Sequence, residues 1–198
     1  MADAAACRPA PTIDGVKVGV LAVQGNFREH AAMLRELGAD VVEVRLPEEL
    51  DGLDGLVIPG GESTAISRLM RLYGLEDAIR GFAGPVFGTC AGMILLDREH
   101  LSLVDVEVDR NAYGRQLASF EADLDLGEGE PLRGVFIRAP RVRRHGDDVE
   151  VLAAHEGIPV LLRQGRFLVA SFHPELTGDT RVHARFLELV REEQGVRA

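Results

Sequence analysis

The sequence predicts an α/β fold built on a doubly wound sheet that is parallel in its first half and antiparallel or mixed in its second. From Val16 to Leu96, short apolar runs alternate with segments of helical periodicity, and units this short imply right-handed crossovers between parallel strands. After Leu96, short β-like segments follow one another, which is typical of antiparallel strands. We therefore expect two kinds of strand pairing along the chain.

The first half begins with a near-continuous apolar run over residues 16–23, as expected for a parallel strand that is covered on both faces. A helix should follow, because apolar residues recur at helical spacing until Gly38, a favourable helix stop. These residues are Phe27, Ala31, Leu34 and Leu37. Further strands are predicted at residues 41–44, 56–58 and 85–87, and further helices at about 64–73, closed by Gly74, and 75–82.

The second half contains β-like segments at residues 101–108, 119–126, 134–138, 149–152 and 159–162. The turn Gln164-Gly165 should join the last of these to residues 167–171 as a hairpin. A final helix is expected over about residues 179–193. The sequence contains no internal repeat or interdomain linker, so we expect a single domain of flavodoxin-like type.

Composition limits the possible functions. A chain of 198 residues is long enough for one well-packed domain and short for two. The hydrophobic fraction of 46% and the charged fraction of 27% are ordinary for a globular protein, and no apolar run approaches the roughly 20 residues of a membrane span. A formal net charge of −10 argues against nucleic acid as a partner.

The cysteines and the first residues indicate the compartment. Residues 1–15 lack the basic start and long apolar middle of a secretory signal, and we expect them to be a disordered leader. Only Cys7 and Cys90 are present. A disulfide framework is therefore implausible, and a reducing cytoplasm fits best.

The stretch Gly88-Thr89-Cys90-Ala91-Gly92 predicts a nucleophile at a sharp turn between a strand and a helix. Small residues on both sides of Cys90 are needed there, because bulky ones would collide with the helix and the adjoining strand. The amino end of the helix favours a thiolate. The alternative is that Cys90 is an inert core cysteine.

His173 and Glu175 are the predicted partners of this nucleophile. Pro174 biases His173 towards an extended conformation, in which residues two apart project to the same side. Glu175 can then fix the tautomer of His173 and leave the other ring nitrogen facing Cys90. The alternative is a surface histidine in a turn. We adopt that interpretation for the other histidines, which are His30, His100, His145, His155 and His183.

Gly60-Gly61 follows the third predicted strand. Two glycines allow close approach to a ligand and can direct an N–H towards developing negative charge. Together with the N–H of Ala91, Gly61 could form an oxyanion hole. The alternative is a simple turn with Ser63 as the helix cap. The segment is not a phosphate-binding P-loop, because no Gly-Lys-Ser/Thr follows.

Several motifs together resemble the glutaminase subunits of pyridoxal 5'-phosphate synthase, within the class I, triad-type glutamine amidotransferases. The similarity runs in order from about Val16 to the last helix, so we assign residues 16–198 to one glutamine amidotransferase domain. The motifs are Val23-Gln24-Gly25, residues 59–64 (Pro-Gly-Gly-Glu-Ser-Thr), 88–92 (Gly-Thr-Cys-Ala-Gly), 110–116 (Arg-Asn-Ala-Tyr-Gly-Arg-Gln), 136–140 (Phe-Ile-Arg-Ala-Pro) and 171–176 (Ser-Phe-His-Pro-Glu-Leu).

The resemblance implies an enzyme that hydrolyses L-glutamine to L-glutamate and ammonia. It implies that Cys90 attacks the amide to form a thioester, that His173 transfers protons and that Glu175 orients His173. It also implies a set of residues that hold the substrate: Gly61, Glu62, Ser63, Arg110, Ile137 and Arg138. The two arginines suit an α-carboxylate and Glu62 an α-ammonium.

The resemblance further implies a partner. A separate (β/α)₈-barrel synthase subunit would receive the ammonia and make pyridoxal 5'-phosphate, so that compound would be a product of the complex, and we expect neither a cofactor nor a metal in this chain. Docking would complete the oxyanion hole. The alternatives are a glutaminase for another synthase, as in histidine or nucleotide biosynthesis, a cysteine hydrolase or peptidase of similar fold, and a non-catalytic binding subunit.

Overall fold

A seven-stranded sheet forms the centre of the computed structural model, which describes residues 15–110, 119–127 and 129–197. The strand order is β2 (Asp40–Val44), β1 (Lys17–Leu21), β3 (Gly55–Ile58), β4 (Val86–Thr89), β11 (Phe167–Ala170), β10 (Ile158–Gln164) and β9 (Glu150–His155). The first five are parallel, and β10 and β9 join them antiparallel. The predicted flavodoxin-like fold class is confirmed, with β11 in the place of a fifth parallel strand.

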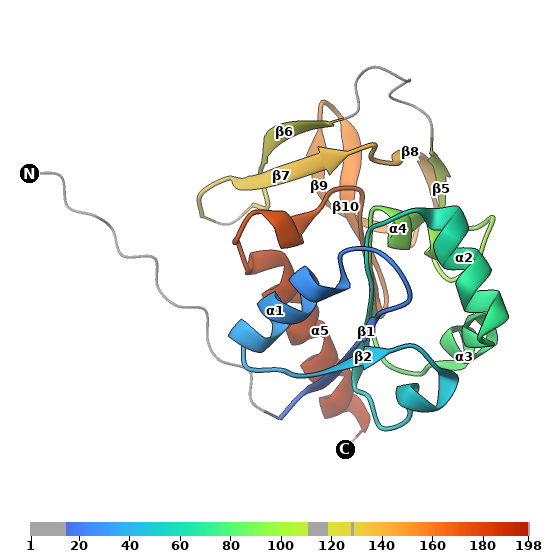
Figure 1. Ribbon diagram of the computed structural model, residues 1–198. Helices are drawn as coiled ribbons and strands as arrows, with labels where there is room; N and C mark the ends of the chain where they lie inside the picture. Colours follow the sequence, from blue (N-terminus) through green and yellow to red (C-terminus); the bar gives the residue numbers. More distant parts are fainter. Residues whose placement is uncertain (1–14, 111–118, 128, 198) are drawn as a thin grey trace, which may run out of the picture.

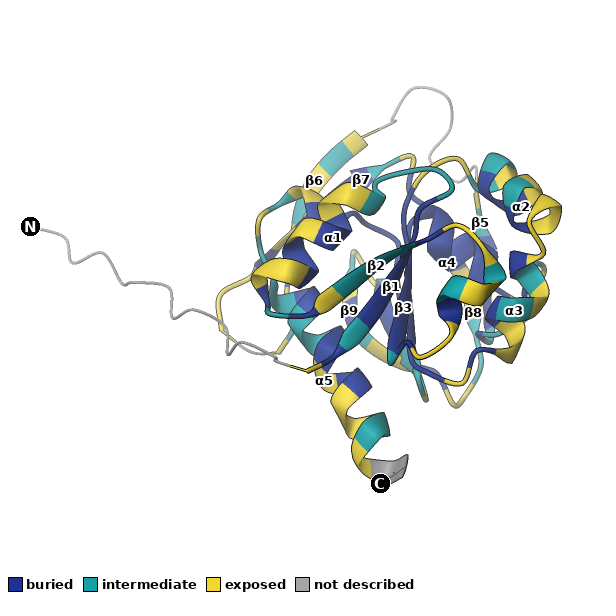
Figure 2. Ribbon diagram, turned by 60° about the horizontal axis from the view of Figure 1, so that its bottom comes forward, coloured by how far each residue is buried: buried dark blue, intermediate teal, exposed yellow. Residues whose placement is uncertain are grey.

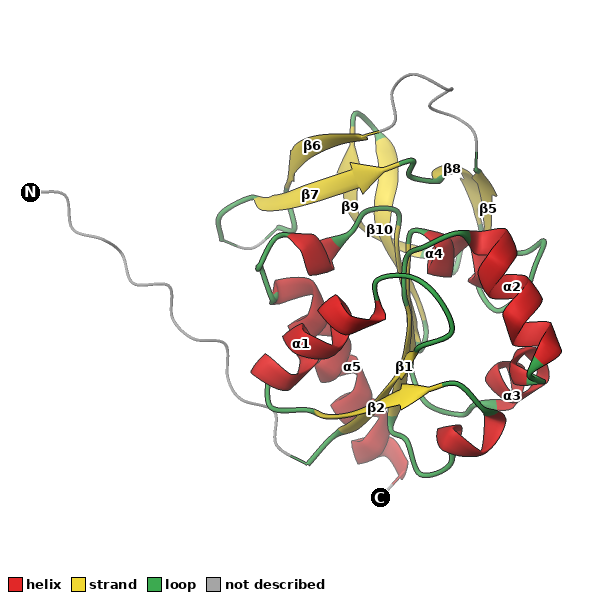
Figure 3. Cartoon of the chain, in the orientation of Figure 1, coloured by secondary structure: helices red, strands yellow, loops and turns green. Residues whose placement is uncertain are grey.

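Two layers of helices cover the sheet (Figures 1 and 3). On one face lie α1 (Phe27–Glu36) and α5 (Arg181–Arg197). On the other lie α2 (Ser63–Leu72), α3 (Leu75–Gly81) and α4 (Ala91–Leu96). Two 3-10 turns, η1 (Pro47–Leu50) and η2 (Pro174–Leu176), complete the connections. Among the described residues, no helix is long and apolar enough to cross a membrane.

The apolar runs form strands because both of their faces are buried. Successive residues of β1 pack into different cores: Val18 and Val20 join the cluster under α1 and α5, and Leu21 joins the one under α2 and α3. Every residue of β3 and β4 is also buried. Figure 2 shows this central part of the sheet as dark blue between more exposed helices. The doubly covered strands predicted from the continuous apolar runs are confirmed.

Two small antiparallel sheets stand outside the central one. One pairs β5 (Val106–Asp109) with β8 (Arg141–His145), and the other pairs β6 (Ser119–Leu124) with β7 (Leu132–Ile137). The β6–β7 hairpin contacts η2, which follows β11, and it lies over the end of the central sheet where β11 finishes (Figure 1). It therefore brings the end of β7 to the edge where the parallel strands finish.

The structure differs from the sequence prediction at three places in detail. The strand expected at residues 101–108 is limited to β5, because Leu101 and Val104 turn back to hydrogen-bond to Leu95 and Leu96. The strand β8 was not predicted, because Arg-Val-Arg-Arg-His contains a single apolar residue. The cap of α2 is Glu62 rather than Ser63: its carboxylate accepts the N–H groups of Thr64 and Ala65. Residues 1–14 of the expected leader lie outside the described part of the chain.

Four connecting segments begin at the same edge of the sheet, where the parallel strands finish. They follow β1, β3, β4 and β11, and they contain Gln24 to Asn26, Gly60-Gly61, Cys90 and residues 171–175 respectively. Because these strands are parallel, their carboxyl ends lie together, as expected for the site of a doubly wound sheet. The hairpin at Gly165, whose φ is 53°, returns the chain so that β11 runs parallel to β4.

Two glycines beside Cys90 are required by close packing. A Cβ atom on Gly92 would overlap the backbone carbonyl oxygen of Ile58, and one on Gly88 would lie 2.7 Å from the backbone carbon of Gly92. Neither obstacle is the end of a flexible side chain. The collision predicted from the sequence for bulky neighbours of Cys90 is therefore present in the fold.

We expect Gly92→Ala to lower the free energy of unfolding by about 3 kcal/mol, because β3 and α4 must separate to admit the methyl group. Urea unfolding followed by circular dichroism measures this. Gly81→Ala is the matched control: a Cβ there meets no atom within 4 Å, and alanine favours helix over glycine. An unchanged midpoint for Gly92→Ala would contradict the packing argument.

Candidate active site

Cys90 lies at the junction of β4 and α4 in a conformation that few L-residues adopt. Its φ is 48° and its ψ is −102°, which is sterically unfavourable for a residue with a side chain. Its N–H donates to the carbonyl oxygen of Ala170 at 2.8 Å, and its carbonyl oxygen accepts the N–H of Ile94 at 3.3 Å. The backbone is held on both sides, so the thiol stays at the carboxyl end of the strand.

His173 and Glu175 form a buried pair beside this thiol. His173 Nδ1 lies 2.7 Å from Glu175 Oε1, and a carboxylate accepts, so Nδ1 carries the proton. The other ring nitrogen, Nε2, is then available to the Cys90 thiol, with which His173 interacts. The backbone N–H of His173 donates to the carbonyl oxygen of Val135 in β7 at 2.8 Å. The structure therefore brings Cys90, His173 and Glu175 together in the spatial order that the sequence predicts.

The pair has strongly shifted pKa values. Burial alone would lower the pKa of His173, but the hydrogen bonds with Cys90 and Glu175 outweigh it and raise this pKa to about 10. Burial would raise the pKa of Glu175, but His30, His173 and Asn26 face the carboxylate and lower this pKa to about 2. The imidazolium and the carboxylate therefore stabilise one another across the neutral pH range.

Gly60 makes room for the histidine. A Cβ atom on Gly60 would overlap His173 Cε1 and would lie 3.4 Å from Cys90 Cβ. The carbonyl oxygen of Gly60 accepts the N–H of Asn26 at 3.1 Å, which fixes the plane of the peptide between Gly60 and Gly61. Ala91, which directly follows Cys90, begins α4, and the first N–H groups of a helix have no partner within it.

A cavity of about 430 Å³ opens above Cys90 and His173. Its walls contain all six of the residues predicted to hold the substrate, namely Gly61, Glu62, Ser63, Arg110, Ile137 and Arg138. Glu175 lies behind His173, and neither it nor Ala91 lines the cavity. Of the segment 110–116, only Arg110 falls within the described residues.

Two charged side chains at the rim already have partners. The carboxylate of Glu62 caps α2, and the backbone N–H groups of Ala65 and Thr64 hold its pKa below the usual range. Arg110 Nη1 lies 3.4 Å from Ser63 Oγ. Arg138 has a φ of 44°, which turns the chain sharply after β7. Positive and negative groups therefore face the same cavity from different elements.

The sequence matches the model of the SNO glutamine amidotransferase family over residues 20–192. This stretch contains Cys90, His173, Glu175 and every residue that lines the cavity. The chain belongs to this family.

Relatives with similar sequences support the same assignment. The pyridoxal 5'-phosphate synthase subunit PdxT of Thermosipho africanus is 53% identical over 190 residues, which cover 89% of this chain and 100% of the relative. The protein of the same name from Mycobacteroides abscessus is 54% identical over 187 residues, covering 88% and 97%. The family resemblance inferred from the motifs is confirmed.

Solved structures of family members and of more distant proteins share the fold. A crystal structure of a glutamine amidotransferase superimposes with a TM-score of 0.82 at 50% identity and covers 89% of this chain and 100% of its own. A protein from Thermoplasma acidophilum, described as part of a putative GMP synthase, reaches a TM-score of 0.73 at 19% identity, covering 92% and 97%. The second match shows the common fold alone.

Sequence reasoning missed four residues that line the cavity, namely Gln24, Asn26, Thr64 and Ile94. Gln24 Oε1 accepts the N–H of Glu62 at 2.9 Å, and Asn26 Nδ2 donates to Glu175 Oε1 at 3.1 Å. Gln24 and Asn26 could have been found from the sequence, because they follow the strand β1, just as Gly60-Gly61 follow β3. Polar residues that follow a buried parallel strand therefore indicate the site as glycines do.

The surface interpretation of two histidines is wrong. His30 and His183 are fully buried beneath the site, whereas His100, His145 and His155 are half-buried. His30 shares the apolar face of α1 with Phe27 and Leu34, at spacings of three and four residues. That spacing indicates burial for His30, and His183 directly follows the buried Val182.

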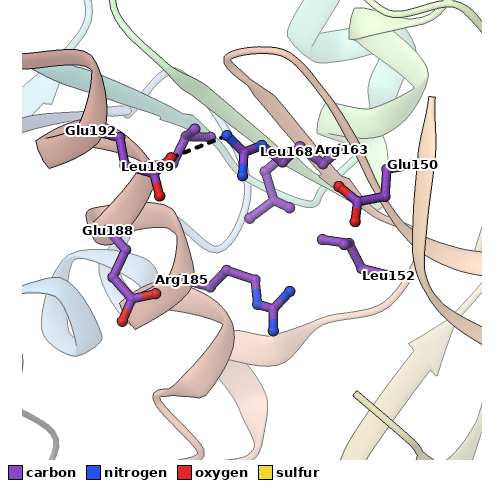
Figure 4. A pocket seen from close by; sticks show the side chains of 8 residues that line it. All are labelled: Glu150, Leu152, Arg163, Leu168, Arg185, Glu188, Leu189 and Glu192. Atoms are coloured by element: carbon purple, nitrogen blue, oxygen red, sulfur yellow. Dashed lines mark hydrogen bonds and ion pairs between the residues drawn. The ribbon is translucent and has the colours of Figure 1, made fainter. Parts of the chain in front are cut away.

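A second cavity, of about 150 Å³, lies between the β9–β10 hairpin and α5 (Figure 4). Arg185 and Glu188 approach it from α5, and Glu150 approaches it from β9. Arg163 on its wall is paired with Glu192 at 3.1 Å. It shares no residue with the cavity above Cys90, and neither a cysteine nor a serine is among the residues that line it.

The raised pKa of His173 predicts its titration. The protonated imidazole stabilises the fold fully below the ordinary value of 6.5, and this contribution is lost as the pH rises through about 10. Nuclear magnetic resonance of the imidazole carbons should therefore show His173 protonated at pH 8. Glu175→Gln should lower its midpoint, because the neutral amide no longer stabilises the imidazolium.

The control for this titration is Glu43→Gln, a change on the outer strand β2. It should leave the His173 midpoint where it is in the unmodified chain. A midpoint near 6.5 in the unmodified chain would contradict the paired arrangement.

Proposed function

We propose that this chain is the glutaminase subunit of a pyridoxal 5'-phosphate synthase and that it hydrolyses L-glutamine to L-glutamate and ammonia. The observation that carries the proposal is the strained Cys90 beside the His173–Glu175 pair, at one cavity, in a member of the glutamine amidotransferase family. The relatives that share about half of its sequence are named as subunits of this synthase. That name favours this synthase over those of histidine or nucleotide biosynthesis.

The first half of the reaction forms a thioester. The Cys90 thiolate attacks the side-chain amide carbon of glutamine, and the amide oxygen gains the negative charge. His173, protonated on both nitrogens, gives the Nε2 proton to the leaving nitrogen. The C–N bond breaks, ammonia departs and the acyl group remains on sulfur.

The second half returns the enzyme to its starting state. His173 takes a proton from water on Nε2, and the resulting hydroxide adds to the thioester carbon. The C–S bond then breaks, which releases glutamate and the Cys90 thiolate. Throughout, Glu175 keeps Nδ1 protonated and stabilises the imidazolium.

The N–H groups of Gly61 and Ala91 would stabilise the negative oxygen of each tetrahedral intermediate. In the free chain, the hydrogen bond from Asn26 to the carbonyl oxygen of Gly60 holds the Gly60–Gly61 peptide in one orientation. Once this bond breaks, the two glycines offer little steric resistance to rotation of the peptide. Docking of the synthase subunit would rotate this peptide and complete the oxyanion hole. The free chain should therefore be weakly active.

The charged groups at the rim suit an α-amino acid. The guanidinium groups of Arg110 and Arg138 would bind the α-carboxylate, and Glu62 would bind the α-ammonium while it still caps α2. Ser63 and Ile137 would line the remaining walls. The side-chain amide of glutamine then reaches down to Cys90.

The partner would be the (β/α)₈-barrel subunit that combines ammonia with sugar phosphates. Ammonia released into water is diluted and protonated, so a protected route between the two subunits conserves it. Pyridoxal 5'-phosphate is the product of the complex and not a cofactor of this chain. The free thiol of Cys90 suits the reducing cytoplasm, where we place the complex.

We expect glutamate release by the full chain to rise strongly when the barrel subunit is added, because docking completes the oxyanion hole. Removal of an oxyanion donor typically costs about a hundredfold or more in kcat, and a similar gain is expected on docking. A coupled glutamate dehydrogenase assay measures the rate. Cys90→Ala should abolish it in both conditions.

The outcomes separate the parts of the proposal. Equal activity with and without the barrel subunit would remove the docking step and leave the glutaminase. Activity that survives Cys90→Ala would remove the triad. No activity in either condition would favour a glutaminase for another synthase.

Arg110→Gln should raise the KM for glutamine about tenfold and change kcat much less, because the lost interaction is with a group remote from the reacting carbon. Steady-state kinetics with the barrel subunit present measure both constants. Arg45→Gln, a change of the same kind at an exposed position directly after β2, is the control. A fall in kcat with an unchanged KM would mean that Arg110 does not bind the substrate.

A further inference from the structure

Two histidines lie directly beneath Glu175 and have no role in the chemistry described above. His30 on α1 and His183 on α5 are both completely buried, at the place where these two helices lie side by side (Figure 1). His30 Nδ1 is 2.8 Å from His183 Nε2. Titratable groups buried this deeply are costly to keep unless they serve the structure or the site.

His30 connects this pair to the triad. Its other nitrogen, Nε2, lies 3.0 Å from Thr89 Oγ1, at the end of β4, and 3.3 Å from Glu175 Oε2. Glu175 Oε1 already accepts from His173 and Asn26. Oε2 is buried and has no hydrogen-bond partner among the described residues, and the His30 nitrogen is the polar group that faces it.

The positions of the protons on His30 and His183 follow from the acceptors that face their ring nitrogens. A carboxylate oxygen accepts only, so a bare Nε2 on His30 would place two acceptors against each other in a buried site. Nε2 of His30 therefore carries its proton, and Nδ1 is bare. His183 must then donate from Nε2, which leaves its own Nδ1 bare.

The surroundings of His183 agree with this assignment. Its Nδ1 is buried and has no hydrogen-bond partner among the described residues, and a buried bare nitrogen is less costly than a buried N–H without an acceptor. The groups that face the two rings are Glu175 and Thr89 together with the ring of Phe87, with the charges of His173 and Glu29 further out. Burial lowers the pKa of both histidines, that of His183 to about 3. Both rings are therefore neutral at neutral pH.

We propose that His183 and His30 form a directional hydrogen-bonded chain that ends on Glu175 and fixes this carboxylate for His173. His183 Nε2–H donates to His30 Nδ1, the proton on His30 Nε2 is shared between Thr89 Oγ1 and Glu175 Oε2, and Glu175 in turn sets the tautomer of His173. Both are positioning residues, because neither touches the substrate or Cys90. The effect on catalysis rests on the role proposed for His173 and Glu175, whereas the hydrogen bonds between His183, His30 and Glu175 do not depend on that role.

The first test reads the tautomers directly and needs no activity. Long-range nitrogen–proton correlation spectra of the full chain, with imidazoles labelled with nitrogen-15, distinguish protonated from bare ring nitrogens at pH 7. We expect Nε2–H and bare Nδ1 for both His30 and His183. A proton on Nδ1 of His30 would overturn the proposal, because Nε2 could then not donate to Glu175.

The second test removes one hydrogen-bonding side chain at a time from the series His183–His30–Glu175. His30→Leu removes the donor to Glu175, whereas His30→Gln keeps an amide N–H at the position of Nε2. We expect the kcat for glutamate release, with the barrel subunit present, to fall about tenfold in His30→Leu with KM unchanged, and to recover largely in His30→Gln. His183→Leu should produce a smaller fall and a mixture of His30 tautomers.

A general loss of stability is excluded by a matched variant. Ile79→Val removes a methyl group from the core on the other face of the sheet and should leave kcat unchanged, and thermal unfolding of all variants shows which remain folded. An unchanged kcat in a folded His30→Leu would overturn the inference and leave the glutaminase intact. If the unmodified chain releases no glutamate at all, the proposed function fails, and the tautomer spectra still decide whether the chain of hydrogen bonds exists.

Discussion

The left-handed backbone of Cys90 is the constraint on which the rest of the site depends. A residue with a side chain stays at a φ of 48° only when its surroundings leave no alternative. Here β11 holds its N–H, α4 holds its carbonyl oxygen, and Gly88 and Gly92 let the neighbouring backbones approach within contact distance. The strain is therefore balanced by the packing of the sheet, and the thiol is fixed at the height where His173 lies.

The site lies where the two hydrophobic cores, one on each face of the central sheet, meet. Cys90 leads into α4, whose side chains belong to the core under α2 and α3, whereas Phe172 beside His173 belongs to the core under α1 and α5. Gly60 lies between them, and a Cβ atom there would meet both His173 and Cys90. Three glycines, Gly60, Gly88 and Gly92, therefore lie where Cys90, His173 and the adjoining backbones pack too closely to admit a Cβ atom.

Much of this arrangement could be predicted from the sequence. The parallel strands, the turn at Cys90 and the pairing of His173 with Glu175 follow from periodicity and from residues two apart in an extended chain. The strand β8 could not be predicted, because its Arg-rich sequence gains its partner only when β5 is placed beside it. The burial of His183 was equally hidden, since it depends on the docking of α5 against α1. What sequence reasoning missed are contacts between segments far apart in the chain, where local preference carries little information.

The return of the chain through the β10–β11 hairpin has a consequence for how the protein is made. Cys90 and its elbow belong to the first half of the chain, but the strand that holds its N–H and the imidazole beside it come from residues 167–175. As synthesis proceeds from the amino end, the thiol emerges long before its base. The two side chains can come together only after residues 167–175, which include β11 between β4 and β10, have been synthesised.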